Sequence, residues 1–347
     1  MSVSAGPQTQ TPTARAMAVT GRLPNFIVAG VMKGGTTSLF TWLAQHPDFF
    51  PSRVKETTFF RPFYENEVGV DPETLSLDAY RRFFEEAGDQ RFVFESTPGY
   101  INGGGRLARH LDAHLPDLRV AFVLREPVDR ARSYFEFQQG LLNLPKNQRF
   151  ADYVTECLAR EREAGGRPDW PHRGLWGGRY ADLLREWSDV FGPRMRVLFF
   201  EELKRDGRAF TEGLLAWLGA RGLDACPIAF SVENRTYLPK NALLHRIAML
   251  ANDRFEPFLR RNRGLKTAAR SLYYRFNGEA KKARGDDGVA QARAYFAESN
   301  VALLRLLRER QPDVAPPGWL ADAAPGQDGA AAALMRAGDS AAGPASA

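Results

Sequence analysis

The sequence predicts an α/β fold in which one domain is built around a central, mainly parallel sheet flanked by helices. Short runs rich in β-branched and aromatic residues occur at 26–29, 92–94, 120–124 and 197–200, and amphipathic helical patterns separate them. Strands that alternate with helices favour a parallel sheet covered on both faces. The chain has 347 residues, 44% hydrophobic and 25% charged, which is the composition of a folded globular protein.

Helical periodicity and breaker residues place the helices around these strands. Pro47 stops the helix that follows the first strand, and Pro116 stops the helix that precedes the third strand. Residues 240–290 are basic and carry few strand signals, so we expect helices and loops over the sheet there rather than a second domain. The predicted helices cover residues 37–46, 78–87, 106–114, 128–139, 180–190, 208–218, 243–250 and 289–310.

The two ends of the chain lack hydrophobic periodicity. We expect a disordered N-terminal segment over residues 1–22, a folded domain over 23–320 and a disordered Ala/Gly-rich tail over 321–347. The N-terminal segment has no apolar run typical of a signal peptide, and no stretch of about 18 apolar residues occurs in the chain. Cys157 and Cys226 cannot make a disulfide framework. These features predict a cytoplasmic protein without a membrane span.

The formal net charge of +6 suits an anionic small ligand, a nucleic acid or a membrane surface. The densest basic segments, 260–263 and 281–284, fall short of a nucleic-acid arm, and we interpret them as solvated helix faces or loops. We therefore expect no nucleic-acid partner, and the oligomeric state is not indicated.

Residues 26–40 combine a strand, a glycine-rich turn and the start of a helix. Gly30, Gly34 and Gly35 allow the backbone to approach a ligand closely, and the amides that open the helix point toward an anion. The segment therefore predicts an anion-binding loop. Its further hydrogen-bond donors are the side chains of Lys33, Thr36, Thr37 and Ser38.

The glycine spacing from Gly30 to Gly35 matches the phosphate loop G-x-x-x-x-G-K-[ST] and indicates a P-loop-like domain. Thr36, however, occupies the lysine position of that motif, and the positive charge lies inside the loop at Lys33. The strand at 120–124 runs into an arginine rather than an aspartate that would hold Mg²⁺. We therefore expect an anionic ligand that is bound without a metal ion.

A second candidate phosphate site follows the strand at 120–124. Arg125 stands at its carboxyl end, Pro127 opens the next helix, and Ser133 lies about two turns into that helix. From the residues alone, Arg125 and Ser133 either converge on one phosphate or have structural roles, with Arg125 paired to a carboxylate and Ser133 packed.

These motifs, in this order, resemble the PAPS-dependent sulfotransferases, where PAPS is 3′-phosphoadenosine-5′-phosphosulfate. Residues 26–47 are similar to the 5′-phosphosulfate loop of the family and its continuation, and residues 120–134 are similar to its 3′-phosphate motif. The resemblance covers roughly residues 24–310. It implies that the 5′-phosphosulfate is bound by Lys33, Gly34, Gly35, Thr36, Thr37 and Ser38, and the 3′-phosphate by Arg125 and Ser133.

Residues 52–60 contain Lys55-Glu56-Thr-Thr-Phe-Phe and resemble the Lys-Glu-x-x-Phe-Phe element of heparan-type and related bacterial sulfotransferases. The resemblance implies that Glu56 is the general base and that Lys33 is the second catalytic residue. Residues 92–101, 178–187 and 200–203 are similar to later segments of the family. Ser96 stands where the heparan branch often carries a lysine, and this departure argues against a glycosaminoglycan acceptor.

Other segments are less specific. Residues 234–241 interleave Arg235 and Lys240 with an aromatic residue and are our candidate for the adenine side of the donor. Residues 165–174 suit either a mobile flap over an acceptor or a plain surface loop. The five histidines lack metal-ligand spacing, and we interpret them as surface residues.

The sequence thus predicts a sulfotransferase that moves the sulfuryl group of PAPS to a hydroxyl or amine of a small-molecule, lipid or carbohydrate acceptor and releases PAP (3′,5′-adenosine bisphosphate), with no metal. The alternatives are a P-loop nucleotide kinase and a non-catalytic nucleotide-binding protein of the same fold.

Overall fold

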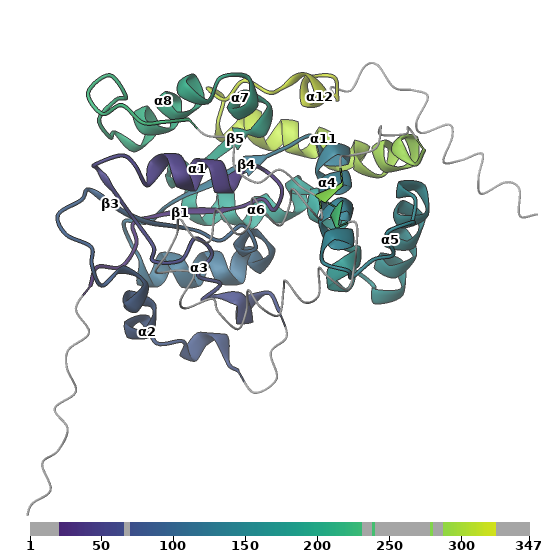
Figure 1. Cartoon of the computed structure of the whole chain (residues 1–347), viewed down its shortest axis with the longest axis horizontal. Helices are drawn as coiled ribbons and strands as arrows, with labels where there is room; N and C mark the ends of the chain where they lie inside the picture. The colour runs from purple at the N-terminus through teal and green to yellow at the C-terminus, as the bar shows by residue number, and fades with distance from the viewer. Residues whose placement is uncertain (1–20, 66–69, 231–237, 240–277, 280–286, 324–347) are drawn as a thin grey trace, which may run out of the picture.

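The computed structural model describes residues 21–65, 70–230, 238–239, 278–279 and 287–323. Its centre is a five-stranded sheet in the order β2-β3-β1-β4-β5, and every neighbouring pair of strands in it is parallel. A two-stranded antiparallel ladder pairs β6 with β7. The predicted α/β class with a parallel sheet is therefore confirmed (Figure 1). The strands are β1 (Phe26–Gly30), β2 (Phe49–Pro51), β3 (Phe92–Ser96), β4 (Arg119–Leu124), β5 (Met195–Phe199), β6 (Leu238–Pro239) and β7 (Gly278–Glu279).

Helices cover both faces of the sheet. In Figure 1, α1 and α8 lie above the strands and α3 lies below them. Successive strand residues point to opposite faces of the sheet, and both faces are covered by helices. Both sets of strand residues are therefore buried, which explains the continuous apolar runs of β1 and β4. The described helices are α1 (Thr36–Leu43), α2 (Leu77–Arg81), α3 (Gly104–His114), α4 (Pro127–Gly140), α5 (Phe150–Ala164), α6 (Tyr180–Phe191), α7 (Phe200–Arg205), α8 (Gly207–Leu218), α11 (Val289–Arg310) and α12 (Gly318–Ala321).

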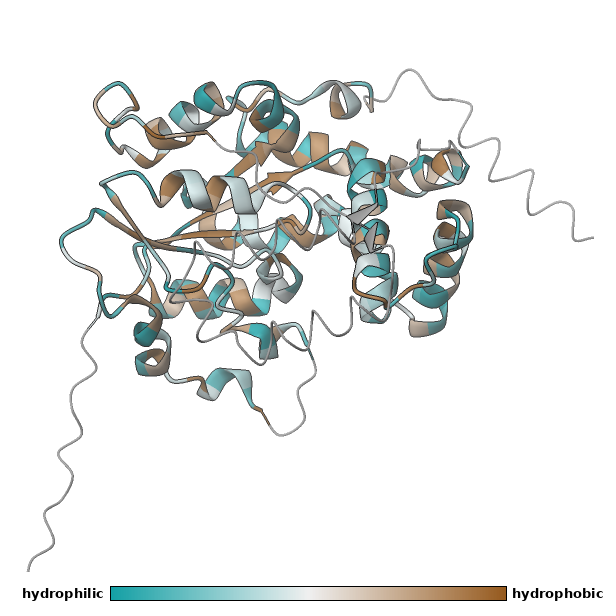
Figure 2. Ribbon diagram, viewed as in Figure 1, coloured by the Kyte–Doolittle hydropathy of each residue, from teal (hydrophilic) through white to brown (hydrophobic). Residues whose placement is uncertain are grey.

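The hydrophobic core has three parts. Ile27 and Phe122 pack with α3, α6 and α11 on one face of the sheet, whereas Phe26 and Val123 pack with α1 and α8 on the other. A third cluster joins α4, α5 and the start of α11 around Tyr153. Figure 2 shows hydrophobic residues gathered along the strands and hydrophilic ones along much of the outer helix surface. Burial of these apolar faces is the main stabilising contribution to the sheet and its helices.

The strand order creates a crevice between β1 and β4. The chain runs from β1 to neighbours on one side, β3 and β2, and then crosses to β4 and β5 on the other. In open parallel sheets, ligands bind at the carboxyl ends of the strands at such a switch point. The turns that follow β1 and β4 are the two segments that the sequence assigned to phosphate binding.

Most predicted elements are confirmed with shifted ends, but several details were wrong. The helix predicted over 78–87 is the short α2 followed by a 3₁₀ turn, Arg82–Phe84. The strand predicted over 197–200 starts at Met195, and Phe200 opens α7 instead of ending the strand. The prediction omitted β2 and α5. The predicted helix over 243–250 and most of the basic region 240–290 lie outside the described residues, and the disorder of the two termini stays a prediction.

Reading all the histidines as surface residues was also wrong. His46, His110 and His172 are buried. Each of them can be accommodated in the interior because one of its ring nitrogens has a hydrogen-bond partner. His46, for example, accepts a hydrogen bond from the Asp48 amide through Nδ1. His114 is exposed, as expected, and His245 lies outside the described residues.

The described helices and cysteines bear on the remaining expectations. None of those helices combines the length and apolar character needed to cross a bilayer. Cys157 and Cys226 are buried free thiols, and burial raises the pKa of Cys157 to about 12.

Candidate active site

The glycine-rich turn after β1 forms the predicted anion-binding loop. Lys33 and Gly35 both have positive φ angles, 70° and 87°, so the chain coils tightly before α1 begins at Thr36. A Cβ atom on Gly34 would lie 2.2 Å from the carbonyl oxygen of Val123 on the neighbouring strand β4. Glycine is therefore required at 34 by close packing and favoured at 35 by conformation. The amides that open α1 belong to Thr36, Thr37 and Ser38, and these residues line the pocket described below.

The turn after β4 is held by hydrogen bonds from three directions. Tyr180 Oη donates to the carbonyl oxygen of Arg125 at 2.7 Å, and the Glu126 amide donates to Glu201 Oε1 at 2.8 Å. Glu126 also caps α4, because its side chain accepts from the Asp129 amide at 2.6 Å. Burial raises the pKa of Glu126. The turn thus presents Arg125 in a fixed position at the carboxyl end of β4.

Arg125 and Ser133 come together at one pocket, as the phosphate-binding interpretation requires. The Arg125 side chain is 13% exposed, and its Nη1 donates to the carbonyl oxygen of Lys33 at 3.4 Å, which ties the two phosphate segments together. It also lies 3.7 Å from Asp129 Oδ2 and 4.7 Å from the centre of the Phe200 ring. Arg125 therefore has the carboxylate neighbour of the alternative interpretation, and its binding of a phosphate stays a prediction.

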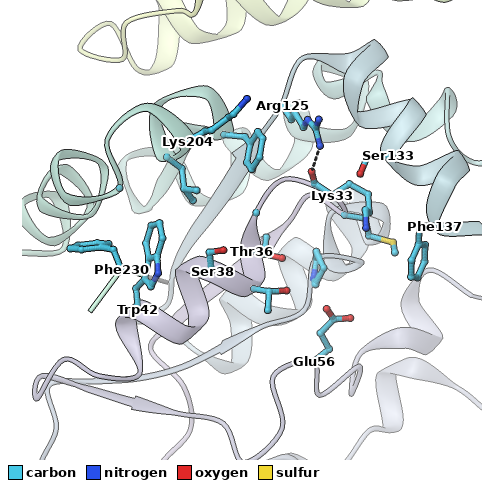
Figure 3. Close-up of a pocket in the computed structure, with 17 residues that line it drawn as sticks. Lys33, Thr36, Ser38, Trp42, Glu56, Arg125, Ser133, Phe137, Lys204 and Phe230 are labelled. Carbon is cyan, nitrogen blue, oxygen red and sulfur yellow. Dashed lines mark hydrogen bonds between the residues drawn. The ribbon is translucent and has the colours of Figure 1, made fainter. Parts of the chain in front are cut away.

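The pocket has a volume of about 480 Å³ and gathers residues from six separate stretches of the chain. That volume lies within the usual range for nucleotide-sized ligands. Figure 3 shows Trp42 and Phe230 together at one end, with Lys33, Ser133 and Phe137 at the other. Its lining residues are Met32, Lys33, Gly35, Thr36, Thr37, Ser38, Trp42, Glu56, Pro98, Arg125, Ser133, Phe137, Phe200, Leu203, Lys204, Gly207 and Phe230. Every predicted site residue except Gly34 lines it, and Gly34 lies in the adjoining backbone.

Glu56 lines the same pocket from a different part of the chain. Its carboxylate lies 2.5 Å from Lys55 Nζ, and its side chain is 46% exposed. It is therefore accessible to a second substrate that enters from solvent, while the loop and α4 surround the opposite part of the pocket (Figure 3).

A buried carboxylate, Glu95, anchors the segment that carries Glu56. Glu95 is fully buried at the end of β3 and accepts hydrogen bonds from Thr57 at 2.8 Å, from Thr97 at 2.5 Å, from Tyr100 at 3.0 Å and from Tyr80. Thr57 follows Glu56 directly in the chain. Burial raises the pKa of Glu95, and the four hydroxyl donors oppose that shift. The network fixes the backbone beside Glu56 to the sheet.

Several pocket residues were missed from the sequence. Trp42 lies one helical turn beyond Ser38 on α1, so the i, i+4 spacing could have indicated it. Phe200 and Lys204 follow β5, and the rule that ligands bind at carboxyl ends of strands could have indicated them. Phe230 gave no signal in the sequence. It packs edge-on against Trp42, with ring centres 4.9 Å apart.

Two further segments, 165–174 and 234–241, were candidates for a flap over the acceptor and for the adenine side of the donor, and the structure describes one of them fully. Residues 234–241, the candidate adenine loop, lie outside the described residues except for Leu238–Pro239 in β6. Residues 165–174 include a 3₁₀ turn, Trp170–His172, and are tied down by the side chains of Tyr134 and Tyr153, which donate to the carbonyl oxygens of Trp170 and Pro171. This anchoring favours the plain-loop interpretation over the flap.

The fold and the site define a nucleotide-binding α/β protein, and comparison with known proteins identifies its family. The sequence model of the sulfotransferase domain matches residues 23–226, and the chain belongs to the sulfotransferase family. The predicted resemblance is thereby confirmed for these residues. The family match ends well before residue 310, where the sequence resemblance was expected to end.

Individual relatives agree with this assignment. A membrane-associated sulfotransferase, kil1, from Dictyostelium discoideum is 35% identical over 142 residues, 40% of this chain and 28% of the relative. Human heparan sulfate glucosamine 3-O-sulfotransferase 3B1 is 30% identical over 178 residues, 51% of this chain and 41% of the relative. The match thus spans less than half the length of these curated relatives.

Among solved structures, a sulfotransferase from Alicyclobacillus acidocaldarius is 27% identical, with a TM-score of 0.50. The match covers 70% of this chain and 96% of that one. This similarity supports the P-loop-like α/β fold with a parallel central sheet.

Proposed function

We propose that this protein transfers the sulfuryl group of PAPS to a hydroxyl or amine of a small-molecule, lipid or carbohydrate acceptor and releases PAP. The observation that carries the proposal is the shared pocket. The loop after β1, the turn after β4 and the segment with Glu56 meet there in a protein of the sulfotransferase family. The pocket combines helix-terminal amides with three cationic residues, Lys33, Arg125 and Lys204, which suits a ligand with phosphate groups.

On the donor side, the residues act by binding and orientation. The Gly35 amide and the hydroxyls of Thr36, Thr37 and Ser38 hold the 5′-phosphosulfate, and Arg125 and Ser133 hold the 3′-phosphate, while the Gly34 amide closes the loop by donating to the Val31 carbonyl oxygen at 3.0 Å. Trp42 and Phe230 supply an aromatic surface at the end of the pocket away from Lys33 and Ser133, where the adenine of the donor can stack. Lys33 neutralises the negative charge that develops on the bridging oxygen of the donor.

On the acceptor side, Glu56 takes the proton of the attacking hydroxyl or amine. A bond forms between that oxygen or nitrogen and sulfur, the bond from sulfur to the bridging oxygen breaks, and PAP leaves with that oxygen. Positioning and charge stabilisation carry most of the catalysis in such in-line transfers.

We further propose that the reaction needs no metal ion and takes place in the cytoplasm of a bacterium. Lys33 and Arg125 already supply positive charge where phosphate groups would bind, and the two cysteines are free thiols, as a reducing compartment favours. The similarity to the Alicyclobacillus acidocaldarius protein supports a bacterial origin.

The test is turnover with PAPS and a panel of hydroxyl and amine acceptors in buffer that contains EDTA. We expect PAP to be released in step with an acceptor product that has gained one SO₃ unit. Transfer of a phosphoryl group from ATP with Mg²⁺ would instead support the kinase alternative, and PAP binding without turnover on any acceptor would support the non-catalytic one.

A further inference from the structure

A second, smaller pocket adjoins the donor pocket. Its volume is about 20 Å³, and Met32 and Pro98 line both pockets. The volume is that of a single water-sized group, so it can hold one polar substituent of a ligand but not a ring. We call this second pocket the side slot.

The side slot meets the donor pocket at Pro98, and Glu56 is among the residues that line the donor pocket. A Cβ atom on Gly99, next to the shared Pro98, would lie 2.9 Å from Tyr64 Oη. Because Met32 and Pro98 line both pockets, a molecule that occupies the side slot can extend into the pocket that Glu56 lines.

The walls of the side slot are aromatic. Tyr134, Trp170 and Trp176 line it, and the rings of Tyr134 and Trp170 lie 5.7 Å apart. Trp170 is 36% exposed, which is unusual for a large apolar side chain and leaves its ring accessible at the rim of the slot. Such surfaces pack against the flat face of an aryl or sugar ring.

Arg130, also in the side slot, is a buried charge without a carboxylate partner. It is 2% exposed, its Nη2 donates to the carbonyl oxygen of Gly174, and its guanidinium lies 5.9 Å from the centre of the Tyr134 ring. Its Nε has no hydrogen-bond partner, and no carboxylate of the described residues lies within 4.0 Å of it. Burying an arginine in this way is costly unless an anion compensates it.

Two more arginines add positive charge to the same neighbourhood. Arg173 lines the side slot and is occupied by Glu65, to which both of its terminal nitrogens donate. Arg167 is half-buried and forms no ion pair with the described residues, and burial together with repulsion by Arg173 lowers its pKa. Arg173 is therefore paired with a carboxylate, whereas Arg130 and Arg167 have no ion-pair partner among the described residues.

We propose that the side slot binds an anionic group, a carboxylate, of the acceptor, with Arg130 as its principal partner, while Arg167, which does not line the slot, adds positive charge at longer range. The aromatic walls pack against the ring that bears the carboxylate, and the ring presents its hydroxyl to Glu56. This inference rests on the proposed function, since it names the class of acceptor for the same site.

The experiment compares two pairs of probes, in each of which a carboxylate is replaced by a neutral polar group. They are 4-hydroxybenzoate with 4-hydroxybenzamide, and methyl glucuronide with methyl glucoside. Each is titrated calorimetrically into the protein saturated with PAP. We expect the carboxylate member of at least one pair to bind about 10-fold more tightly than its neutral partner, because charge-assisted hydrogen bonds are the stronger ones. The pair that shows the preference distinguishes an aryl from a sugar acceptor.

Variants locate the preference. Arg130→Gln is expected to abolish it and Arg167→Gln to reduce it several-fold, whereas Arg162→Gln, which removes an exposed charge from α5, leaves it unchanged. Arg167 makes no hydrogen bond to the part of the chain that the structure describes, so this variant decides the matter if Arg130→Gln does not fold. Equal affinities within both pairs, no binding of either carboxylate, or a preference that survives in Arg167→Gln and in any folded Arg130→Gln would overturn the inference. A protein that fails to bind PAP would instead contradict the proposed function.

Discussion

The donor half of the site and the acceptor half are built in different ways. The donor half consists of two short turns, after β1 and after β4, in which backbone amides, glycines and a few side chains do the binding. The acceptor half depends on contacts between residues far apart in the chain, such as Thr57 with Glu95 and Arg173 with Glu65. A ligand of fixed chemistry can be recognised by local backbone geometry. A variable ligand is recognised by side chains that a fold can exchange.

Removing the proposed base is the sharpest way to separate the two halves. Glu56→Gln is expected to lower kcat by roughly 10²- to 10⁴-fold, because the acceptor keeps its proton, while the affinity for PAP stays unchanged. Steady-state kinetics and PAP titration measure the two effects. Glu86→Gln, an exposed carboxylate elsewhere, serves as the control. A variant that retains full kcat would remove Glu56 from the mechanism.

Discrimination of the 3′-phosphate tests the donor half. Arg125→Gln is expected to reduce the preference for PAP over ADP by about 10- to 100-fold, since one charge-assisted contact is lost. The ratio of the two dissociation constants measures this effect, and Arg185→Gln on the exposed face of α6 is the matched control. If PAP and ADP weaken equally, Arg125 does not read the 3′-phosphate.

Adding a methyl group at Gly34 tests how closely the loop after β1 packs against β4. Gly34→Ala places a Cβ against the Val123 carbonyl oxygen, so we expect a loss of roughly 1–3 kcal/mol in the free energy of unfolding and weaker PAP binding. Gly213→Ala on α8 has open space around the new methyl and is expected to stabilise by up to about 1 kcal/mol. Thermal or denaturant unfolding distinguishes the two. Equal stability of both variants would contradict the described loop geometry.

The buried carboxylate of the acceptor half has a pH signature. Because burial raises the pKa of Glu95, the folded protein holds that proton more tightly than the unfolded chain does. Stability from this group is therefore greatest at low pH and is lost as the pH rises above its ordinary value of 4.5 toward the folded pKa. The Glu95→Gln variant has no titrating group at this position, so its free energy of unfolding does not lose this contribution as the pH rises.

Unfolding measured across that pH range is the test of this signature. The stability of Glu95→Gln relative to the wild type should improve as the pH rises. An unchanging difference would show that Glu95 titrates normally. In addition, loss of the carboxylate acceptor leaves some of the four hydroxyls poorly satisfied, at a cost of about 1–3 kcal/mol.

The sequence was sufficient to predict most of the sheet and the donor half of the site. Gly34, Lys33, Arg125 and Ser133 belong to motifs whose spacing is local, so a strand and its following turn bring them to one edge. The amphipathic pattern of α5, with Phe150, Tyr153, Val154 and Cys157 buried on one face, was readable but was omitted.

The acceptor half could not be predicted in the same way. The Glu95 network joins Thr57, Tyr80 and residues 95–100, which are three separate stretches of the chain, and the environment of Arg130 depends on Gly174 and Tyr134. Neither arrangement produces a periodic or local pattern in the sequence that could have predicted it. Ser133 and Arg130 lie three residues apart on α4. Ser133 occupies a recognisable motif position, whereas the role of Arg130 depends on which surfaces fold against it.

The central claim is that the pocket is a PAPS site, and calorimetric titration of the protein with PAP and with ADP in EDTA tests it most directly. We predict tight binding of PAP, much weaker binding of ADP, and a marked loss of PAP affinity in Lys33→Ala. Preference for ADP or ATP that requires Mg²⁺, or PAP binding that is indifferent to Lys33, would contradict it.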